Sequence, residues 1–287
     1  MLAALASCAT IPPRAADTLW INVLSPDATA YLAVDVAGNR PLLKKAMEGA
    51  GASMADVATL LDMSRRALVA VYLRPPEPVR FQVVALGGYP SFFIGLRLGT
   101  NAEWKRVDTP QGGFFSNTKN LQAAIPSDAV LLASNGGMEN LLARLYRPAV
   151  FALPPAVEAA MASSDAVLYM PQLPAGLGAA SGSGTGGALP IHEVWMEASV
   201  KDGSYEISAT VAVEGEKSAR SVALILRLVL VSWLNTEKVE NVSGKLKSVS
   251  IVPDGPSVKV SGLQFTSEEV LSLFASLLAP QTPAEAK

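Results

Sequence analysis

The sequence predicts an α+β fold, a layered α/β/α domain in which amphipathic helices cover a mainly antiparallel sheet. Short apolar runs are joined in pairs by Gly, Pro, Asn and Asp, which is typical of β-hairpins. Between these pairs, apolar residues recur at helical spacing. With 287 residues, 50% of them apolar and 17% charged, the chain can bury a sizeable core. Helices and hairpins each need a partner for their apolar faces, so they are expected to form layers.

In the first half of the chain, strands and helices are expected to alternate. Pro41 is a favourable first residue of a helix, and Ser53 can cap the next one. Met138, Leu141, Leu142 and Leu145 recur at i, i+3, i+4 and i+7, as on one face of a helix. Strands are expected at residues 30–36, 67–73, 80–86, 92–98, 113–115 and 129–133, and helices at residues 41–49, 53–61, 101–107, 138–146 and 154–161.

The second half shows the same alternation with clearer turn signals. Asp202-Gly203 is the strongest hairpin signal in the chain, and Thr266 followed by Glu269 forms a capping box for the last helix. Residues 176–187 are rich in glycine and predict a flexible loop. Strands are expected at residues 166–170, 192–200, 205–213, 247–252 and 257–260, and helices at residues 216–234 and 266–279.

Three similar segments suggest an internal duplication within one domain. Residues 26–32, 127–132 and 164–169 each place an Asp-Ala or Asp-Ala-Val step before an apolar run. We therefore expect a single α+β domain over residues 19–280, with pseudo-repeat halves at about 19–150 and 151–280. Residues 281–287 are expected to form a disordered tail.

The N-terminus carries the main targeting signal. Leu5-Ala6-Ser7-Cys8 matches the bacterial lipobox, in which the cysteine is acylated and becomes the mature N-terminus. Residues 1–7 then form a shortened lipoprotein signal remnant without its basic segment. Residues 8–18 are expected to be a lipidated N-terminus and an extended tether.

Composition and motifs exclude several function classes. The net charge of −2 does not favour nucleic-acid binding, and one Cys with one His excludes the common zinc sites. The glycine-rich segment 182–187 is followed by a strand rather than a helix, so it is not a dinucleotide site. His192 lacks the second histidine of a zinc-protease motif. We expect no catalytic residues, metal or cofactor, and a non-enzymatic protein.

The helices are the informative feature. Residues 216–234 are apolar on nearly every side, with a thin polar stripe through Arg220 and Arg227, as in a helix at the centre of a core or in lipid. The apolar run 222–234, however, is shorter than the roughly 20 residues of a membrane span. Lys44, Lys45 and Arg144 flank other apolar faces, as in helices at a membrane interface.

On the lipobox, the chain length and these helices, the sequence resembles the treponemal outer-membrane lipoproteins that insert amphipathic helices into the bilayer. The resemblance implies a palmitate-type acyl anchor at Cys8, a location at the periplasmic leaflet of the outer membrane, and binding and perturbation of the phospholipid bilayer. The residues expected to enter lipid or to line an apolar cavity are Leu42, Leu43, Met47, Met138, Leu141, Leu142, Leu145, Leu226, Leu230, Trp233, Val270, Leu271 and Phe274.

Two alternatives use the same features differently. A lipid or small apolar ligand carrier would enclose its ligand with the same helix faces and use the membrane only for docking. An assembly or substrate-binding module would instead present the 176–187 loop to a protein partner. A carrier binds ligand in water, an inserting protein needs a bilayer, and a partner module needs neither.

Overall fold

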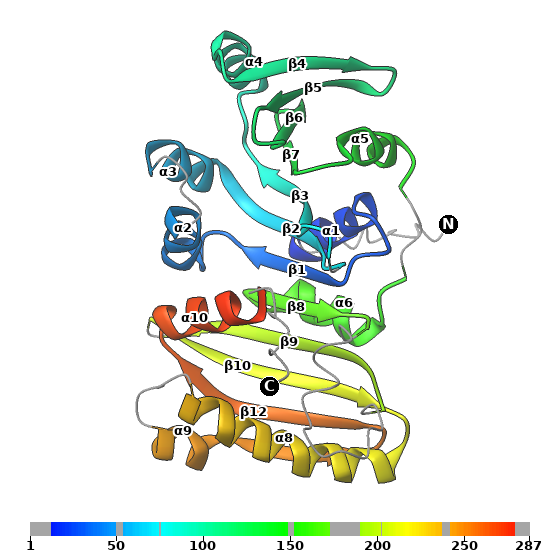
Figure 1. Ribbon diagram of the computed structural model, residues 1–287, viewed down its shortest axis with the longest axis vertical. Helices are drawn as coiled ribbons and strands as arrows, with labels where there is room; N and C mark the ends of the chain where they lie inside the picture. Colours follow the sequence, from blue (N-terminus) through cyan, green and yellow to red (C-terminus); the bar gives the residue numbers. More distant parts are fainter. Residues whose placement is uncertain are drawn as a thin grey trace, which may run out of the picture.

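The computed structural model describes residues 13–49, 54–74, 76–148, 152–172, 190–201, 203–236 and 242–278. The described strands form one 12-stranded sheet, in the order β11-β12-β10-β9-β8-β1-β2-β3-β7-β6-β5-β4. Every neighbouring pair is antiparallel. The α+β class and the antiparallel sheet are thus confirmed (Figure 1). The strands are β1 (Ala30–Asp35), β2 (Ser64–Tyr72), β3 (Arg80–Gly87), β4 (Trp104–Thr109), β5 (Gly112–Asn117), β6 (Gln122–Ser127), β7 (Val130–Ser134), β8 (Ala166–Met170), β9 (Ile191–Lys201), β10 (Ser204–Val213), β11 (Ser250–Asp254) and β12 (Ser257–Phe265).

Helices cover both faces of the sheet, as the alternation of side chains along the strands requires. Along β2, Leu68 and Ala70 are buried against one group of helices, while Ala67 packs toward the other group. Face A, as we call the first, carries α1, η1, α5 and α6, and face B carries α2, α3, α4, α8, α9 and α10. The helices are α1 (Pro13–Thr18), η1 (Leu19–Val23), α2 (Arg40–Gly49), α3 (Met54–Met63), α4 (Ser91–Thr100), α5 (Met138–Tyr146), α6 (Pro155–Ser163), α8 (Glu216–Thr236), α9 (Val242–Ser248) and α10 (Ser267–Leu278).

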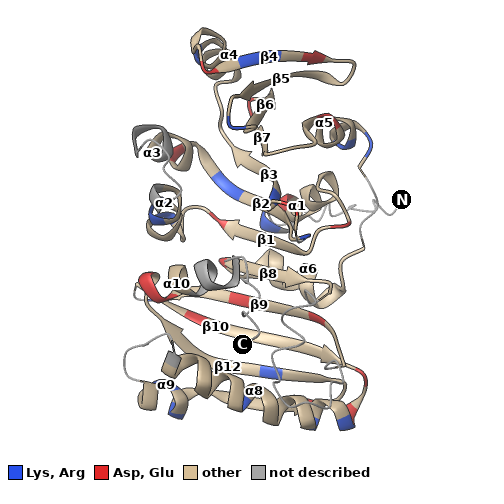
Figure 2. Ribbon diagram, viewed as in Figure 1, with Lys and Arg blue, Asp and Glu red and all other residues tan. Residues whose placement is uncertain are grey.

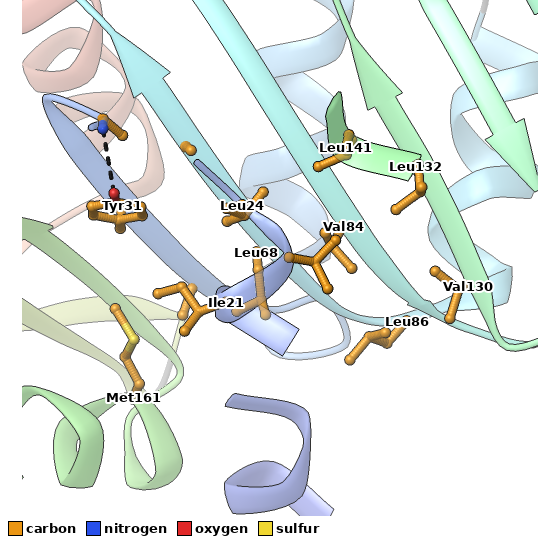
Figure 3. Packing of buried hydrophobic residues seen from close by; sticks show 14 of the residues in the cluster. Ile21, Leu24, Tyr31, Leu68, Val84, Leu86, Val130, Leu132, Leu141 and Met161 are labelled. Carbon is orange, nitrogen blue, oxygen red and sulfur yellow. Dashed lines mark hydrogen bonds between the residues drawn. The ribbon is translucent and has the colours of Figure 1, made fainter. Parts of the chain in front are cut away.

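The core on face A lies between η1, α5, α6 and the central strands. Figure 3 shows Ile21 of η1 and Leu24, which follows η1, near the central strands, with Leu141 of α5 beside Leu132 of β7. Buried Tyr31 keeps its polar end satisfied, because its hydroxyl donates to the Ser25 carbonyl at 2.7 Å and accepts from the Ala28 amide at 3.3 Å. Burial raises the pKa of this phenol.

The core on face B holds α8 and α10 against the other end of the sheet. Val222 and Leu234 of α8 are buried in one cluster with Val258 and Phe265 of β12. The capping box starts α10 as the sequence predicts, since the Thr266 amide donates to Glu269 Oε2 at 2.8 Å and the Glu269 amide donates to Thr266 Oγ1 at 3.3 Å. Glu269 also pairs with Lys245 of α9 at 2.7 Å, which fixes α9 beside α10.

The three similar segments do precede strands, namely β1, β7 and β8, and their aspartates make long-range contacts. Asp165 accepts the Val200 amide at 2.9 Å and the Arg14 guanidinium at 3.1 Å. Asp128 accepts both the amide and the hydroxyl of Ser91, the first residue of α4. The duplication itself stays a prediction.

Part of the expected tether is folded. Residues 13–18 form α1, which packs against α6, and Arg14 forms ion pairs with Asp35 and Asp165. Near it lies Arg66 of β2, only 1% exposed, whose guanidinium donates to the Met161 carbonyl. Burial lowers the pKa of Arg66. The extended chain expected for this part of residues 8–18 is therefore wrong.

Most expected elements match the structure, with one exchange. Residues 92–98 were expected to be a strand and residues 101–107 a helix, whereas the structure has α4 at Ser91–Thr100 and β4 at Trp104–Thr109. Both assignments are wrong. Phe92, Phe93 and Ile94 favour a strand by their intrinsic propensity, and a pattern analysis of the sequence does not include the tertiary contacts that decide the structure here. Strand β6 and helix α9 were not expected, and the 176–187 loop and the 281–287 tail lie outside the described residues.

Candidate membrane-contact surface

The outward face of α8 carries exposed apolar residues beside Arg220 and Arg227, at positions where water favours polar residues. Leu224, Leu228 and Val231 follow at i, i+4 and i+7, on the side opposite the buried Ala219 and Ala223, and are 61%, 65% and 40% exposed. A helix that covers a sheet in water normally carries charged or polar residues along this side. We call these three residues the α8 stripe. It is a contiguous apolar surface rather than a scattered set, which distinguishes it from ordinary exposed residues.

A groove runs along one flank of the same helix. Leu226, Leu230 and Trp233 face Ile251 of β11 and Val260 of β12 across an open groove of about 180 Å³. Trp233 also packs edge-on against Phe265, with ring centroids 5.9 Å apart. The groove extends the apolar surface from the stripe toward the sheet.

Three cationic side chains lie in the first half and the middle of α8. Lys217, Arg220 and Arg227 outnumber the single acidic residue of the helix, Glu216. Arg227 donates to the Ile251 carbonyl at 2.9 Å. Figure 2 shows α8 mostly uncharged, with Lys and Arg toward its N-terminal end. Long cationic side chains beside an apolar face can reach anionic headgroups while their stems lie against apolar groups.

Helix α4 presents a second exposed apolar surface on the same face of the sheet. Phe92, Phe93 and Leu96 are 74%, 68% and 55% exposed, and no residue of α4 is buried. The two phenyl rings meet edge to face at 5.6 Å. Under α4 lies a groove of about 630 Å³, open to solvent and lined on the sheet side by Arg106 and Phe115. We call Phe92, Phe93 and Leu96 the α4 patch.

The start of α4 is held by a carboxylate from the turn before β7. Asp128 accepts the Ser91 hydroxyl at 2.5 Å and the Ser91 amide at 3.1 Å. These hydrogen bonds hold the pKa of Asp128 below its ordinary value. The helix that carries the α4 patch is therefore fixed at its N-terminus by one charged hydrogen-bonding group.

The structure places several expected contact residues in the core. Met138, Leu141 and Leu142 of α5 are at most 2% exposed against η1 and β7, and Leu145 packs beside them, half-buried. The helical spacing that suggested a lipid face here marks the side that covers the sheet. In this conformation Met138, Leu141 and Leu142 pack in the core and Leu145 is partly exposed, so the lipid-contact role expected for them stays a prediction.

The expected contact residues of α2 and α10 that the structure describes are buried or half-buried. Leu42 and Val270 are buried and line a small pocket between the two helices and β8–β10, while Leu43 and Met47 pack half-buried toward α3. Leu271 is half-buried beside them. Cys8 and the side chain of Phe274 lie outside what the structure describes.

The structure brings Leu226, Leu230 and Trp233 together at the α8 groove, while the lipid or ligand contact expected of them stays a prediction. The sequence reasoning missed the α8 stripe on the same helix and the whole α4 patch. One signal could have indicated the stripe: its residues recur at helical spacing on the side opposite the small, buried Ala219 and Ala223. The α4 patch was hidden by the wrong strand assignment.

Metal-binding groups were a second kind of site to consider among the described residues. No group of three or more His, Cys, Asp or Glu side chains within them is arranged to hold a metal ion. His192 is exposed at the start of β9.

Helix α8 is longer than the apolar run in the sequence indicated. By length and composition alone, Glu216–Asn235 could cross a membrane, with a mean hydropathy of 1.3. Such a score is also reached by core helices of soluble proteins, but those are mostly buried, whereas only 22% of this window is buried. The exposed part is what a membrane contact would use.

Comparisons with known proteins identify the fold and the family of this chain. A search of curated proteins finds no match. Crystal forms III and I of the treponemal protein TP0453 both share 19% sequence identity with this chain, with TM-scores of 0.67 and 0.65. They cover 89% and 90% of this chain, and the alignments include 97% and 96% of theirs, which shows a common fold. The family model described as outer membrane-associated lipoprotein TP0453 matches residues 16–243. The chain therefore belongs to the TP0453 family of outer membrane-associated lipoproteins.

Proposed function

We propose that this protein is acylated at Cys8, faces the periplasm from the inner leaflet of the outer membrane, and perturbs the bilayer with apolar helix surfaces. The observation that carries the proposal is the α8 stripe, Leu224, Leu228 and Val231, exposed on the outer side of a sheet-covering helix. The α4 patch adds a second contact on the same face. In this proposal the protein is non-enzymatic and its partner is phospholipid.

An acyl anchor and an apolar surface reinforce each other. An acylated lipobox cysteine would carry two or three acyl chains, more than the single chain that gives only marginal membrane binding, so the anchor alone would hold the protein at the bilayer. Tethering raises the effective concentration of the stripe at the bilayer. Even a weak affinity of the helix for lipid then keeps the stripe bound to the bilayer for much of the time. Lys217 and Arg220 beside the stripe add attraction to anionic headgroups.

Perturbation follows from where the side chains would go. An amphipathic helix lies in the plane of the membrane with its apolar side chains at the boundary between headgroups and acyl chains. Leu224 and Leu228 would then occupy space in one leaflet only. This one-sided insertion spreads the lipids of that leaflet and strains the bilayer.

The carrier alternative draws on the grooves beside α8 and under α4. The α4 groove is large enough for a small ligand, since such sites span roughly 300–1,000 Å³. Ligand sites, however, bury most of the ligand surface. Both grooves are open to solvent, so we place the carrier second.

The test is flotation of the full chain with Cys8→Ser, which removes the acyl anchor, on neutral and anionic vesicles, together with dye release. We expect the unanchored chain to float with the vesicles, more strongly with anionic ones, and to release dye. Binding of apolar ligand in water at a fixed stoichiometry, without flotation, would favour the carrier. A chain that neither floats nor binds ligand would leave membrane contact to the anchor alone and overturn the proposal.

A further inference from the structure

The groove under α4 lies beside a sheet edge that has no partner strand among the described residues. Strand β4 pairs with β5 on one side, and no described strand pairs with its other side. Figure 1 shows β4 as the outermost strand at the top of the molecule, with α4 next to it. Free edges are templates for pairing with another polypeptide, and proline is a common way to block them. The opposite edge strand, β11, carries Pro253, whereas β4 has no proline.

The hairpin geometry tells which backbone groups of β4 point outward. A two-residue turn joins Thr109 to its partner Gly112, and such a turn is closed by a hydrogen-bonded pair. Hydrogen-bonded and non-hydrogen-bonded pairs alternate along antiparallel strands, so the amides and carbonyls of Arg106 and Asp108 face the free edge. An added strand can therefore pair with these four backbone groups.

One residue connects this edge to the groove under α4. Arg106 lines the groove from β4, Phe115 lines it from β5 and Ile125 from β6, while Phe92 and Leu96 line it from α4. Arg106 thus has its backbone at the free edge and its side chain at the groove. Residues directly opposite each other in a sheet point to the same face. A residue paired with Arg106 therefore directs its side chain to the groove side.

The two sides of β4 differ in polarity, which selects the sequence of a partner. On the groove side, Phe92 and Leu96 of α4 are 74% and 55% exposed. On the other side, β4 presents Lys105 and Thr109, with the half-buried Val107 between them. Successive side chains of a strand point to opposite faces. A strand that alternates apolar and polar residues therefore matches both sides.

The chemistry of the edge also favours a polypeptide over other apolar ligands. The side chains of Arg106 and Asp108 pair with each other at 2.9 Å, so a partner needs no charge of its own to balance them. A lipid acyl chain has no N–H or C=O groups, so it would leave the backbone groups of the edge without partners. An extended polypeptide satisfies them by adding a strand to the sheet.

We propose that the β4 edge and the α4 groove form one docking site for an extended polypeptide. The polypeptide adds antiparallel to β4, as all other strands of this sheet pair, and directs alternate apolar side chains into the groove. Transmembrane β-strands have this alternation of apolar and polar residues, and the family is associated with the outer membrane. The partner is then an unfolded transmembrane β-strand of an outer-membrane protein. This site goes beyond the proposed function and does not depend on bilayer contact.

Binding of a labelled peptide to the full chain with Cys8→Ser, in buffer without lipid, tests the site. The probe is a short peptide that alternates leucine and serine, and its binding is followed by fluorescence polarisation. In antiparallel pairing, the peptide residue opposite Arg106 exchanges two hydrogen bonds with it and shares its face, so the leucine amides face β4. We expect saturable binding that methylation of the leucine nitrogens weakens at least about tenfold, and methylation of the serine nitrogens by less than about threefold.

A matched pair of variants tests the edge from the protein side. Asp108→Pro and Asp108→Ala both remove the carboxylate, but only proline removes the outward amide, at a position where edge strands tolerate proline. We expect Asp108→Pro to bind the unmethylated peptide at least about tenfold more weakly than Asp108→Ala. Thermal melts show whether both variants are folded, and the methylated peptides test the same pairing on the unchanged edge.

Three results would overturn the proposal. The first is the absence of saturable peptide binding, which would leave the groove to lipid or to another ligand. The second is a loss on methylation of the serine nitrogens that equals or exceeds the loss for leucine. The third is equal binding by folded Asp108→Pro and Asp108→Ala. Because no lipid is present, each result is independent of vesicle flotation, which tests the proposed function.

Discussion

The α8 stripe gives the most quantitative prediction. Changing Leu224, Leu228 and Val231 together to Ser should weaken vesicle binding of the Cys8→Ser chain by about two orders of magnitude. Fully burying a Leu or Val side chain is worth about 1.5–3 kcal/mol. These three are 61%, 65% and 40% exposed, so transfer of the exposed part to lipid contributes about 1 kcal/mol each. Their sum of about 3 kcal/mol corresponds to about a hundredfold in the partition coefficient.

The assay is the partition coefficient, measured by titrating vesicles and separating the bound chain by flotation. The matched control changes Leu19, Val79 and Val252 to Ser, three exposed apolar residues that lie outside α8. Each surface substitution changes the free energy of unfolding by up to about 0.5 kcal/mol, so both triple variants should stay within about 1.5 kcal/mol of the parent. Equal partition coefficients for the two triple variants would refute the reasoning, because the stripe would then contribute no more than scattered surface residues.

Three further predictions concern the helices. Leu141→Ala should lower the free energy of unfolding by about 3–5 kcal/mol in urea, because Leu141 is fully buried. A loss below about 1 kcal/mol would contradict the assignment of α5 to the core. Thr266→Ala should cost about 1 kcal/mol in the same assay by removing the capping box of α10, and no change would show that the cap contributes nothing. Asp128→Asn should lower the melting temperature at pH 7. The pKa of Asp128 is lowered by the Ser91 hydrogen bonds, so its contribution is present above its unfolded value of about 4 and lost as pH falls through the folded value. The difference between parent and Asp128→Asn should therefore vanish in acid, and a difference that persists there would contradict this assignment.

Local patterns were enough to predict much of the fold. The hairpin of β9 and β10, the Thr266 capping box and the periodicity of α5 each depend on residues close in sequence, and each is confirmed. The antiparallel sheet followed from these hairpins. The order of the strands did not, because β1 pairs with β8 and β3 with β7 across long stretches of chain.

The candidate site was harder to predict, for a physical reason. Periodicity finds an apolar face but does not say whether the sheet or lipid covers it. The buried face of α5 therefore looked like a lipid contact, and the outward stripe of α8 was overlooked. In α4, Gly95 and Gly99 weaken the helical pattern, while Phe92 and Phe93 favour a strand. Gly99 lies 3.7 Å from Phe115 on the sheet, measured from where its Cβ would be, so the helix packs through a small residue and its large ones point outward.

The central claim is that the α8 stripe and the α4 patch enter the hydrocarbon of a bilayer. The most direct test uses Cys8→Ser chains that carry one environment-sensitive fluorophore, attached through Leu228→Cys, Phe93→Cys or, as a control, Val252→Cys. Vesicles contain lipids with a quencher at a known depth along the acyl chain. We predict quenching at acyl-chain depth for the probes on α8 and α4 and none for the probe on β11. Quenching that is absent or equal at all three positions would contradict the claim.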